Sequence, residues 1–226
     1  MEFVVSDMHF YHENIIGFDG RPFNTVNEMN QTLIDNWNAV VHTEDTVYIL
    51  GDMFFGANVE EVENVLSRLN GKKIYIFGNH EKLLRSDRRV LNTHFESSHE
   101  VLNIKHRYNG RDYQVYMSHY PVPMYDGHFR EKAVHLYGHV HKTTEQLYSV
   151  YQQLMNFANR NEPRTHKMLN VGVMMKYMGY EPKPLSYVIE KSEIHSDRLY
   201  RYYNEECGKV MPTLEEFSKQ EYLYLY

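Results

Sequence analysis

Short apolar runs recur along the chain, separated by polar segments or by stretches with helical periodicity. Short runs rich in Val, Ile, Leu and Tyr favour buried β-strands, because these side chains pack well on a pleated surface. We interpret as strands residues 3–5, 46–50, 74–77, 101–105, 113–117, 134–137, 168–171 and 187–190. The pair Asn109-Gly110 lies between two of these runs and predicts a tight hairpin turn.

Apolar residues spaced three or four positions apart predict two amphipathic helices in the first half of the chain. The first covers residues 25–41, where Thr25 and Glu28 form the pattern of a capping box. In the second helix, Asn58 is the expected N-cap and Gly71 the expected end. Residues 144–161 also have helical character, although the segment is polar.

Strands that alternate with helices indicate an α/β fold. The chain has 226 residues, which suits one such domain with a full core. We assign residues 1–190 to this domain. Residues 191–226 are rich in Tyr and charge, and we interpret them as a helical extension packed on the domain. Residues 222–226 alternate like a strand, which would pack on the domain, cover a sheet edge or meet a second subunit, and the sequence decides neither among these nor the oligomeric state.

Composition and charge narrow the range of functions. Hydrophobic residues make up 42% of the chain and charged residues 24%, as in ordinary globular proteins. No apolar run approaches the roughly 18 residues of a membrane helix, so we expect no membrane partner. The net charge of −6 argues against a protein that holds duplex DNA through a basic surface. Cys207 is the one cysteine, which fits a reducing compartment and predicts a cytoplasmic protein.

Polar side chains that can bind metals follow five of the predicted strands. They are Asp7 and His9, then Asp52, then Asn79 and His80, then His119, and finally His139 and His141. Ligands bind at the carboxyl edge of the strands in open α/β sheets, so we expect these side chains to meet at one rim. Their donor atoms are oxygen and imidazole nitrogen without sulfur, which suits manganese, iron, zinc, nickel or cobalt.

The number of candidate ligands indicates two metal ions. More side chains converge than one tetrahedral ion needs, whereas two divalent cations about 3.5–4 Å apart, sharing one carboxylate, would use them. We expect manganese as the cofactor, with iron, zinc, nickel or cobalt as alternatives. A single structural zinc ion is another interpretation, but it predicts a closed site of four ligands.

The calcineurin-like metallophosphoesterases are the family that this ordered set of motifs resembles. The motifs are Asp7-x-His9, Gly51-Asp52, Gly78-Asn79-His80-Glu81, His119 and Gly138-His139-x-His141. The resemblance implies a sandwich of two mixed β-sheets flanked by helices. It also implies a ligand set, in which Asp7, His9 and His141 bind the first metal, Asn79, His119 and His139 bind the second, and Asp52 bridges both.

The same resemblance implies hydrolysis of a phosphoester by a hydroxide held between the two metals. His80 would donate a proton to the leaving alkoxide, and Glu81 would orient His80. Because an alkoxide leaving group needs a proton, we favour a phosphodiesterase over a phosphomonoesterase acting on a small phosphorylated molecule. The substrate would be a nucleotide, a cyclic nucleotide or a short single-stranded nucleic acid.

Features outside the metal motifs bear on the substrate. The opening stretch is similar to a small bacterial and phage subgroup of predicted phosphoesterases. The Arg that grips phosphate in the phosphatase branch is missing after Asp52, which disfavours a protein phosphatase. Arg21 and His12 are our candidates for substrate binding, with a surface Arg and a loop or helix-start His as the alternatives. A non-catalytic scaffold with this fold is the competing class of function, and it is disfavoured because every ligand position is filled.

Overall fold

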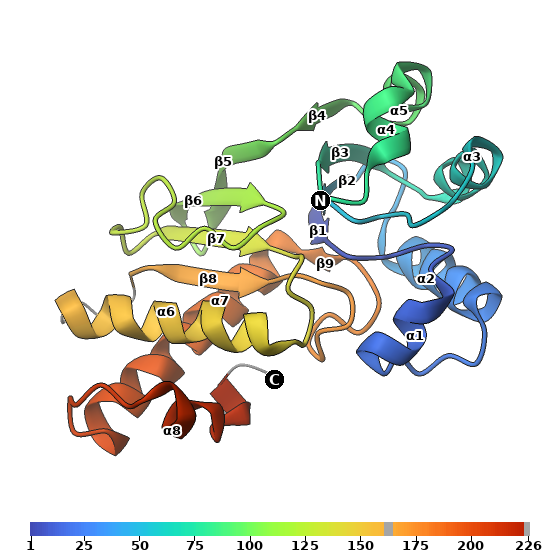
Figure 1. Ribbon diagram of the computed structural model, residues 1–226. Coiled ribbons are helices and arrows are strands. Elements are labelled where there is room, and N and C mark those ends of the chain that lie inside the picture. Colours follow the sequence, from blue (N-terminus) through green and yellow to red (C-terminus); the bar gives the residue numbers. More distant parts are fainter. Residues whose placement is uncertain (161–164, 224–226) are drawn as a thin grey trace.

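Two mixed β-sheets pack face to face in the computed structural model, which describes residues 1–160 and 165–223 (Figure 1). The first sheet has the strand order β4-β3-β2-β1-β9 and the second the order β5-β6-β7-β8. The strands are β1 (Glu2–Val5), β2 (Thr46–Leu50), β3 (Lys72–Ile76), β4 (Ser97–His99), β5 (Val101–Tyr108), β6 (Arg111–Ser118), β7 (Ala133–Tyr137), β8 (Lys167–Asn170) and β9 (Lys183–Pro184). This architecture confirms the predicted α/β sandwich.

The parallel strands of both sheets end near each other. In the first sheet β1, β2, β3 and β4 are parallel, and β9 is antiparallel to β1. In the second sheet β6, β7 and β8 are parallel, and β5 forms an antiparallel hairpin with β6. Ser6, just beyond β1, bridges to Gly172, just beyond β8. The loops that leave the carboxyl ends of both sheets therefore reach the same place.

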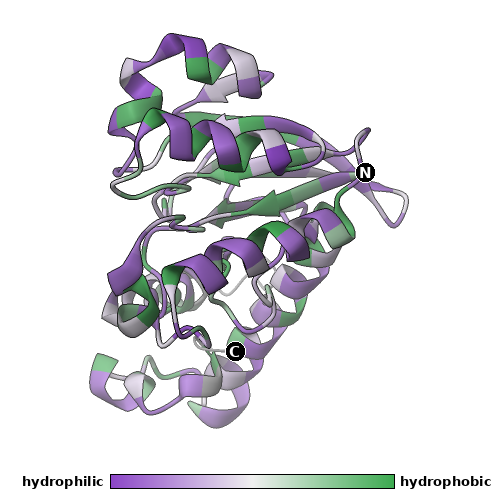
Figure 2. Ribbon diagram, turned by 90° about the vertical axis from the view of Figure 1, so that its right-hand side faces the viewer, coloured by the Kyte–Doolittle hydropathy of each residue, from purple (hydrophilic) through white to green (hydrophobic). Residues whose placement is uncertain are grey.

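Helices flank the two sheets (Figure 1). They are α1 (Glu13–Asp19), α2 (Val26–Val40), α3 (Val59–Arg68), α4 (Lys82–Ser86), α5 (Arg88–His94), α6 (Thr144–Arg160), α7 (Leu185–Arg201) and α8 (Leu214–Ser218), with a π-helical turn at Tyr202–Glu206 and a 3-10 turn at Glu221–Leu223. Figure 2 shows that the helices mix hydrophobic and hydrophilic positions. This pattern fits elements that bury one face against a sheet.

The strands of the first sheet contribute to two cores. Val4 faces the second sheet and belongs to a core with Val115 and Leu136 between the sheets. Phe3 points to the opposite face and belongs to a core with Trp37 of α2. Successive side chains of a strand point to opposite faces, so a buried strand needs apolar residues at every position. This requirement explains why apolar runs identified the buried strands, whereas β4 (Ser-Ser-His) and β9 (Lys-Pro), which are half-buried and contain no apolar run, were not predicted.

The two predicted helix starts differ in their capping. Asn58 forms a full capping box with Glu61 at the start of α3. Thr25 accepts a hydrogen bond from the Glu28 N–H at the start of α2, as predicted. In the predicted capping box the Glu28 carboxylate would accept the Thr25 N–H. It instead accepts the N–H of the preceding residue, Asn24.

Seven of the eight predicted strands are present, with bounds that shift by up to three residues. Asn109 and Gly110 both have positive φ, 49° and 74°, as the predicted hairpin turn requires. The strand predicted at residues 187–190 is wrong, because these residues lie inside α7. Leu185, Val188 and Ile189 are buried at helical spacing, which a short apolar run does not distinguish from a strand.

The predicted end of the second helix is also wrong. Gly71 does not end α3, which ends at Arg68.

The residues after α7 form a small helical cluster on α6. Tyr202, Phe217 and Leu223 pack with Leu147 and Val150 of α6. Helix α7 runs without a break through residue 190, where the sequence placed the end of the first domain. Residue 161 of the predicted helix and residues 224–226 of the strand-like segment lie outside the described residues. In the described part of the chain, no helix combines the length and apolarity needed to cross a membrane.

A buried histidine on β7 couples stability to pH. His135 is fully buried, its Nδ1–H donates to Tyr116 O at 3.2 Å, and its Nε2 accepts from the Val122 N–H at 3.0 Å. Burial lowers the pKa of His135 from 6.5 to about 4. Between these values the unfolded chain binds a proton that the folded protein does not bind, so stability rises with pH across this window.

We predict that His135→Gln removes this part of the pH dependence. Glutamine can still accept from the Val122 N–H, but it does not titrate. The slope of unfolding free energy between about pH 4 and 6.5 should fall by up to about 1.4 kcal/mol per pH unit. Urea unfolding of both proteins across this window measures the difference. Parallel stability curves for the two proteins would contradict the prediction.

Candidate metal centre

The loops after β1 and β2 run side by side and carry the first predicted metal ligands. The Asp7 N–H donates to Gly51 O at 3.2 Å, and the His9 N–H donates to Asp52 O at 3.0 Å. Beyond β1, the Ser6 hydroxyl donates to Leu50 O at 2.6 Å. These bonds continue the pairing of β1 with β2 past the ends of the strands. They fix the first two ligand-bearing loops against each other.

Five of the predicted metal ligands have a left-handed backbone. Their φ values are 56° at Asp7, 54° at His9, 49° at Asp52, 69° at His139 and 47° at His141. Residues with a Cβ rarely adopt this conformation, which costs roughly 1–2 kcal/mol per residue. Backbone strain gathered on side chains that can bind a metal is a mark of a functional site, because folding alone would not select it.

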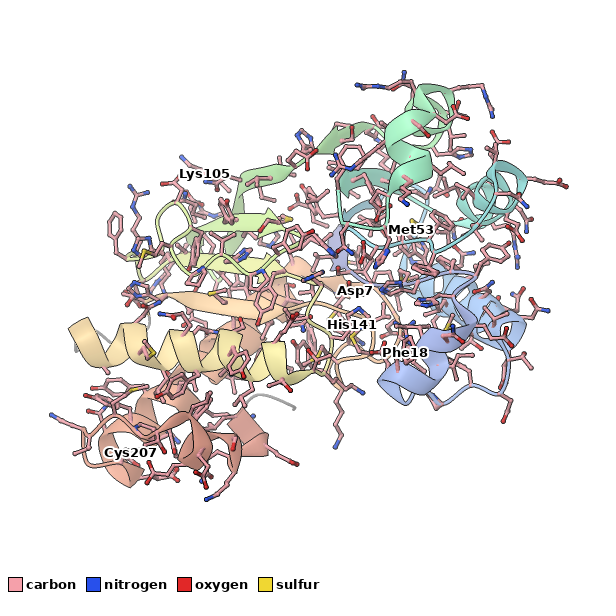
Figure 3. The ribbon with its side chains drawn as sticks, viewed as in Figure 1. Asp7, Phe18, Met53, Lys105, His141 and Cys207 are labelled. Carbon is pink, nitrogen blue, oxygen red and sulfur yellow. The ribbon has the colours of Figure 1, made fainter. Side chains whose placement is uncertain are left out.

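Asp7, His9 and His141 form the first group of donors, which lie within 4.8 Å of one another. The Nε2 atoms of the two histidines are 3.2 Å apart, and His141 Nε2 is 3.7 Å from Asp7 Oδ1. The buried Asp7 carboxylate also accepts the His139 N–H at 3.1 Å. Figure 3 shows Asp7 and His141 close together in the region between the sheets and α1.

Asp52, His119 and His139 form the second group, within the same limit of 4.8 Å. Asp52 Oδ2 is 3.4 Å from His119 Nε2. Asn79 joins this group, since its Oδ1 is 3.0 Å from the same nitrogen. The seven predicted ligands are therefore brought together, although they come from both sheets.

Asp52 lies between the two groups. Its Oδ2 is 4.0 Å from His9 Nε2 in the first group and 3.4 Å from His119 Nε2 in the second. Metal–ligand bonds of roughly 2.0–2.2 Å place two ligands of one ion about 3–4 Å apart. These separations, and a donor set of oxygen and imidazole nitrogen, fit two divalent cations that share Asp52.

Hydrogen bonds turn the Nε2 atoms of two histidines toward the centre. His119 Nδ1–H donates to Leu50 O at 2.8 Å, and His141 Nδ1–H donates to Asp19 Oδ1 at 2.8 Å. A bond at one ring nitrogen fixes the tautomer and leaves the other nitrogen as a metal ligand. Asp19 is a functional residue that the sequence analysis missed. It ends α1 rather than following a strand, so the rule that found the other residues did not apply.

Arg21 is placed differently from either sequence interpretation. Its side chain is 0% exposed, so it is not a surface residue. Its Nη2 donates to Asp7 O and its Nη1 to Met8 O, both at 2.9 Å. Its Nε donates to Asp19 Oδ2 at 2.9 Å. Because these donors are taken by protein acceptors, Arg21 positions the β1 loop and Asp19 instead of gripping phosphate.

Asn170, at the end of β8, holds the loop that carries His141. Its Nδ2 donates to His141 O and to Gln146 Oε1, both at 3.1 Å, and its Oδ1 accepts the Gly172 N–H at 2.9 Å. The sequence analysis gave Asn170 no role. A buried amide that satisfies backbone groups leaves no pattern in residue spacing.

The charges of the centre favour cations. Burial by itself raises the pKa of Asp52, but the hydrogen bond and charge of His119 hold it below its usual range. Burial works against protonation of His119, yet the bond to Asp52 and the charge of Asp7 raise the pKa of His119 to about 9. Burial also opposes protonation of His141, whose pKa is raised by its bond to Asp19. Protons and divalent cations therefore compete for the same positions.

His80 and Glu81 point in different directions. The His80 side chain is 38% exposed, and its Nε2 is 3.8 Å from Asp52 Oδ2. Glu81 is buried, and its carboxylate accepts the Asp52 N–H. This position does not agree with the predicted role of orienting His80. The buried N–H of Asp52 needs an acceptor, which Glu81 provides, and burial raises the pKa of Glu81 to about 7.

His12 lies at the rim of the centre. Its ring stacks on Phe55 with centroids 3.9 Å apart and lies 5.3 Å from the ring of His9. Burial and the nearby charge of His80 lower the pKa of His12. His12 is therefore a neighbour of the first donor group and the N-cap residue at which α1 begins.

Comparison with known families matches residues 1–190 to the calcineurin-like phosphoesterase superfamily domain. Among curated proteins, an uncharacterized protein of Methanocaldococcus jannaschii is 32% identical over 192 residues, which cover 84% of this chain and 90% of that protein. The gene 66 protein of Mycobacterium phage L5 is 33% identical over 78 residues, which cover 34% of this chain and 37% of that protein. The family match confirms the resemblance and includes every residue of the centre.

A solved structure has a similar fold. The crystal structure of AQ665, a protein of unknown function from Aquifex aeolicus, superposes with a TM-score of 0.60 at 25% identity. The superposition covers 84% of this chain and 98% of that one. The family match ends at residue 190, inside α7, so the helical cluster after α7 lies outside the matched domain.

Gly78 approaches the Asp52 carboxylate too closely to be replaced. A Cβ at this position would lie 2.2 Å from Asp52 Oδ1 and 2.8 Å from the Asp52 nitrogen. A Cβ does not approach other heavy atoms to such distances, so any side chain at Gly78 must displace the carboxylate that the two groups share. The matched control is Gly17 of α1, where an added Cβ would meet nothing within 4 Å.

We predict that Gly78→Ala costs about 1–3 kcal/mol of unfolding free energy, as overpacking does, and weakens cation binding. Gly17→Ala should be neutral or should stabilise the protein by about 0.5–1 kcal/mol, because alanine favours a helix over glycine. Denaturant unfolding and calorimetric titration with Mn²⁺ measure the two properties. The idea fails if both variants bind Mn²⁺ as tightly as the wild type.

Proposed function

The chain belongs to the calcineurin-like phosphoesterase superfamily, and from its metal centre we propose that it is a phosphodiesterase dependent on two divalent cations. The position of Asp52, within 4.0 Å of donors from both groups, carries this proposal. When bound, such a pair of cations would stabilise charge on the attacking and leaving oxygens at phosphorus and make water nucleophilic at neutral pH.

The residues divide between the two cations according to their groups. Asp7, His9 and His141 would hold one cation, and Asn79, His119 and His139 the other, with Asp52 shared. Manganese is our first choice, because the donors mix hard oxygen with imidazole nitrogen. Iron, zinc, nickel and cobalt accept the same donors and are the alternatives that a metal screen would compare.

His80 is suited to give a proton to the leaving oxygen. Its side chain is exposed and its Nε2 lies 3.8 Å from Asp52, so a phosphoester at the centre can reach it. The Nε2–H would donate a hydrogen bond to the ester oxygen and pass its proton to that oxygen as the P–O bond breaks. This help matters most for an alkoxide, because a p-nitrophenolate leaves without a proton.

The charge around the centre favours diesters over monoesters. A monoester dianion carries one more negative charge than a diester, and the guanidinium of Arg21, the sequence candidate for neutralising it, is buried against protein acceptors. After Asp52 the loop continues with Met53, Phe54 and Phe55 rather than with a cationic residue. Nucleotides, cyclic nucleotides and short single-stranded nucleic acids are the diesters that we propose. The net charge of −6 disfavours long duplexes.

We predict that protein purified without a chelator contains close to two divalent cations per chain. With added Mn²⁺ it should hydrolyse bis-p-nitrophenyl phosphate faster than p-nitrophenyl phosphate. Elemental analysis and the release of p-nitrophenolate measure these two properties. One ion per chain would contradict the shared carboxylate, and a preference for the monoester would favour a phosphomonoesterase.

We predict that His80→Ala slows hydrolysis of a dinucleotide, from which one nucleoside leaves as an alkoxide, by about 10²–10⁴-fold. The loss toward bis-p-nitrophenyl phosphate should be smaller, and the metal content should not change. His42→Ala, at an exposed histidine before β2, is the control and should retain full activity. Equal losses toward both substrates would show that His80 is not the proton donor.

A further inference from the structure

Exposed aromatic rings border the metal centre next to His80. Phe55 is 37% exposed, and its ring meets the His80 ring edge-on at 4.9 Å. Phe18 of α1 is 77% exposed and meets His12 edge-on at 6.2 Å. Figure 3 labels Phe18 on α1, the helix whose last residue, Asp19, is hydrogen-bonded to His141. Neighbouring exposed rings beside a polar centre indicate a surface that contacts a ligand.

A hollow of about 350 Å³, which we name the His80 hollow, opens beside these rings. Its apolar lining includes Phe54, Phe55, Ala57, Val62 and Leu84. Asn79, His80 and Lys82 bring polar groups to the same hollow. It therefore combines an aromatic wall with hydrogen-bonding groups, directly next to the proposed proton donor.

A second hollow, the His139 hollow, has a volume of about 430 Å³. Tyr120 and Tyr148 line it and are 48% and 52% exposed. The Tyr120 ring meets the His139 ring at a centroid distance of 4.5 Å. Glu145 and Gln152 supply polar groups to its lining. This hollow repeats the combination of flat rings and polar groups beside the other donor group.

The Asp52 carboxylate lies between residues that line the two hollows. Its Oδ2 is 3.8 Å from Nε2 of His80, which lines the first hollow. The same oxygen is 3.4 Å from Nε2 of His119, whose ring centroid lies 5.0 Å from that of His139 in the second hollow. If a phosphodiester binds at Asp52, the two groups esterified to its phosphate can therefore extend into one hollow each.

We propose that each hollow binds one nucleobase, so that the substrate is a phosphodiester of dinucleotide size. A nucleobase has flat faces that stack on aromatic rings and a polar edge that needs hydrogen bonds, and both hollows offer the two together. A lipid chain would instead require uniformly apolar walls. The Glu145 carboxylate and the net charge of −6 disfavour further phosphates, which limits the length of the strand.

This inference rests on the proposed function, because it places the scissile diester at Asp52. Base binding can nevertheless be measured apart from hydrolysis. A deoxyadenosine dinucleoside joined by a methylphosphonate has both bases but no charged phosphate. Calorimetric titration of the protein as purified with this analogue therefore reports on the two hollows.

We expect the wild type to bind the analogue, and Phe55→Leu and Tyr120→Leu each to weaken binding about tenfold, because stacking of one base contributes about that much. Leucine keeps an apolar side chain and removes the ring. Phe129→Leu is the matched control. Phe129 is 50% exposed and contacts His128 and Arg130, so its loss should not change binding.

Absence of binding to the wild type, or equal weakening by all three variants, would overturn the inference. Hydrolysis provides the second measurement. Phe55→Leu and Tyr120→Leu should lower kcat/KM for a dinucleotide more than for methyl p-nitrophenyl phosphate, which has no bases. If the analogue binds but bis-p-nitrophenyl phosphate is not hydrolysed, the proposed function fails and the inferred base binding holds. If hydrolysis occurs without binding of the analogue, the inference alone fails.

Discussion

The metal centre depends on two buried carboxylates whose nearest basic partners are imidazoles. Asp7 and Asp52 are almost inaccessible to solvent, and their partners are His141 and His119. Removing a carboxylate from water costs several kcal/mol unless charge and hydrogen bonds compensate for it. Backbone N–H groups of His139 and His80 supply part of the compensation. The imbalance that remains makes the centre attractive to protons at low pH and to divalent cations when the imidazoles are neutral.

Bringing the metal ligands together strains the backbone locally, and the paired sheets stabilise the strained residues. Parallel strands from both sheets end at one place, and the bridge from Ser6 to Gly172 joins them there. Left-handed residues directly after the strands turn the donors inward. Gly138 is required for a different reason, because a Cβ there would lie 2.0 Å from Ser6 Oγ and 2.5 Å from Asp7 Oδ2. Small residues and strained turns therefore occur where the two sheets meet, and the well-packed cores hold them in place.

The sequence predicted the α/β class and the candidate donors because both follow from local order along the chain, whereas the two-sheet sandwich and the division of the ligands between two metals came from the family resemblance. The donors lie shortly after short apolar runs, so position in the sequence was enough to find them. The residues that were missed or misjudged act through contacts between distant segments. Asp19 reaches His141 across 122 positions, and Glu81 reaches Asp52 across 29. Spacing also does not tell where a long side chain points, which is why Arg21 was expected at the substrate or the surface.

The proposed chemistry and the proposed selectivity depend on different parts of this structure. The metal centre depends on strand ends, whose positions are fixed by the pairing of both sheets. The aromatic rings of the two hollows belong to loops. Phe55 comes after β2 and Asp52, and Tyr120 comes after β6 and His119. Two divalent cations would offset four of the six net negative charges, and they would do so only at the centre. An anionic diester would therefore be attracted to one point of an otherwise acidic protein, and the rings on either side would select what the diester carries.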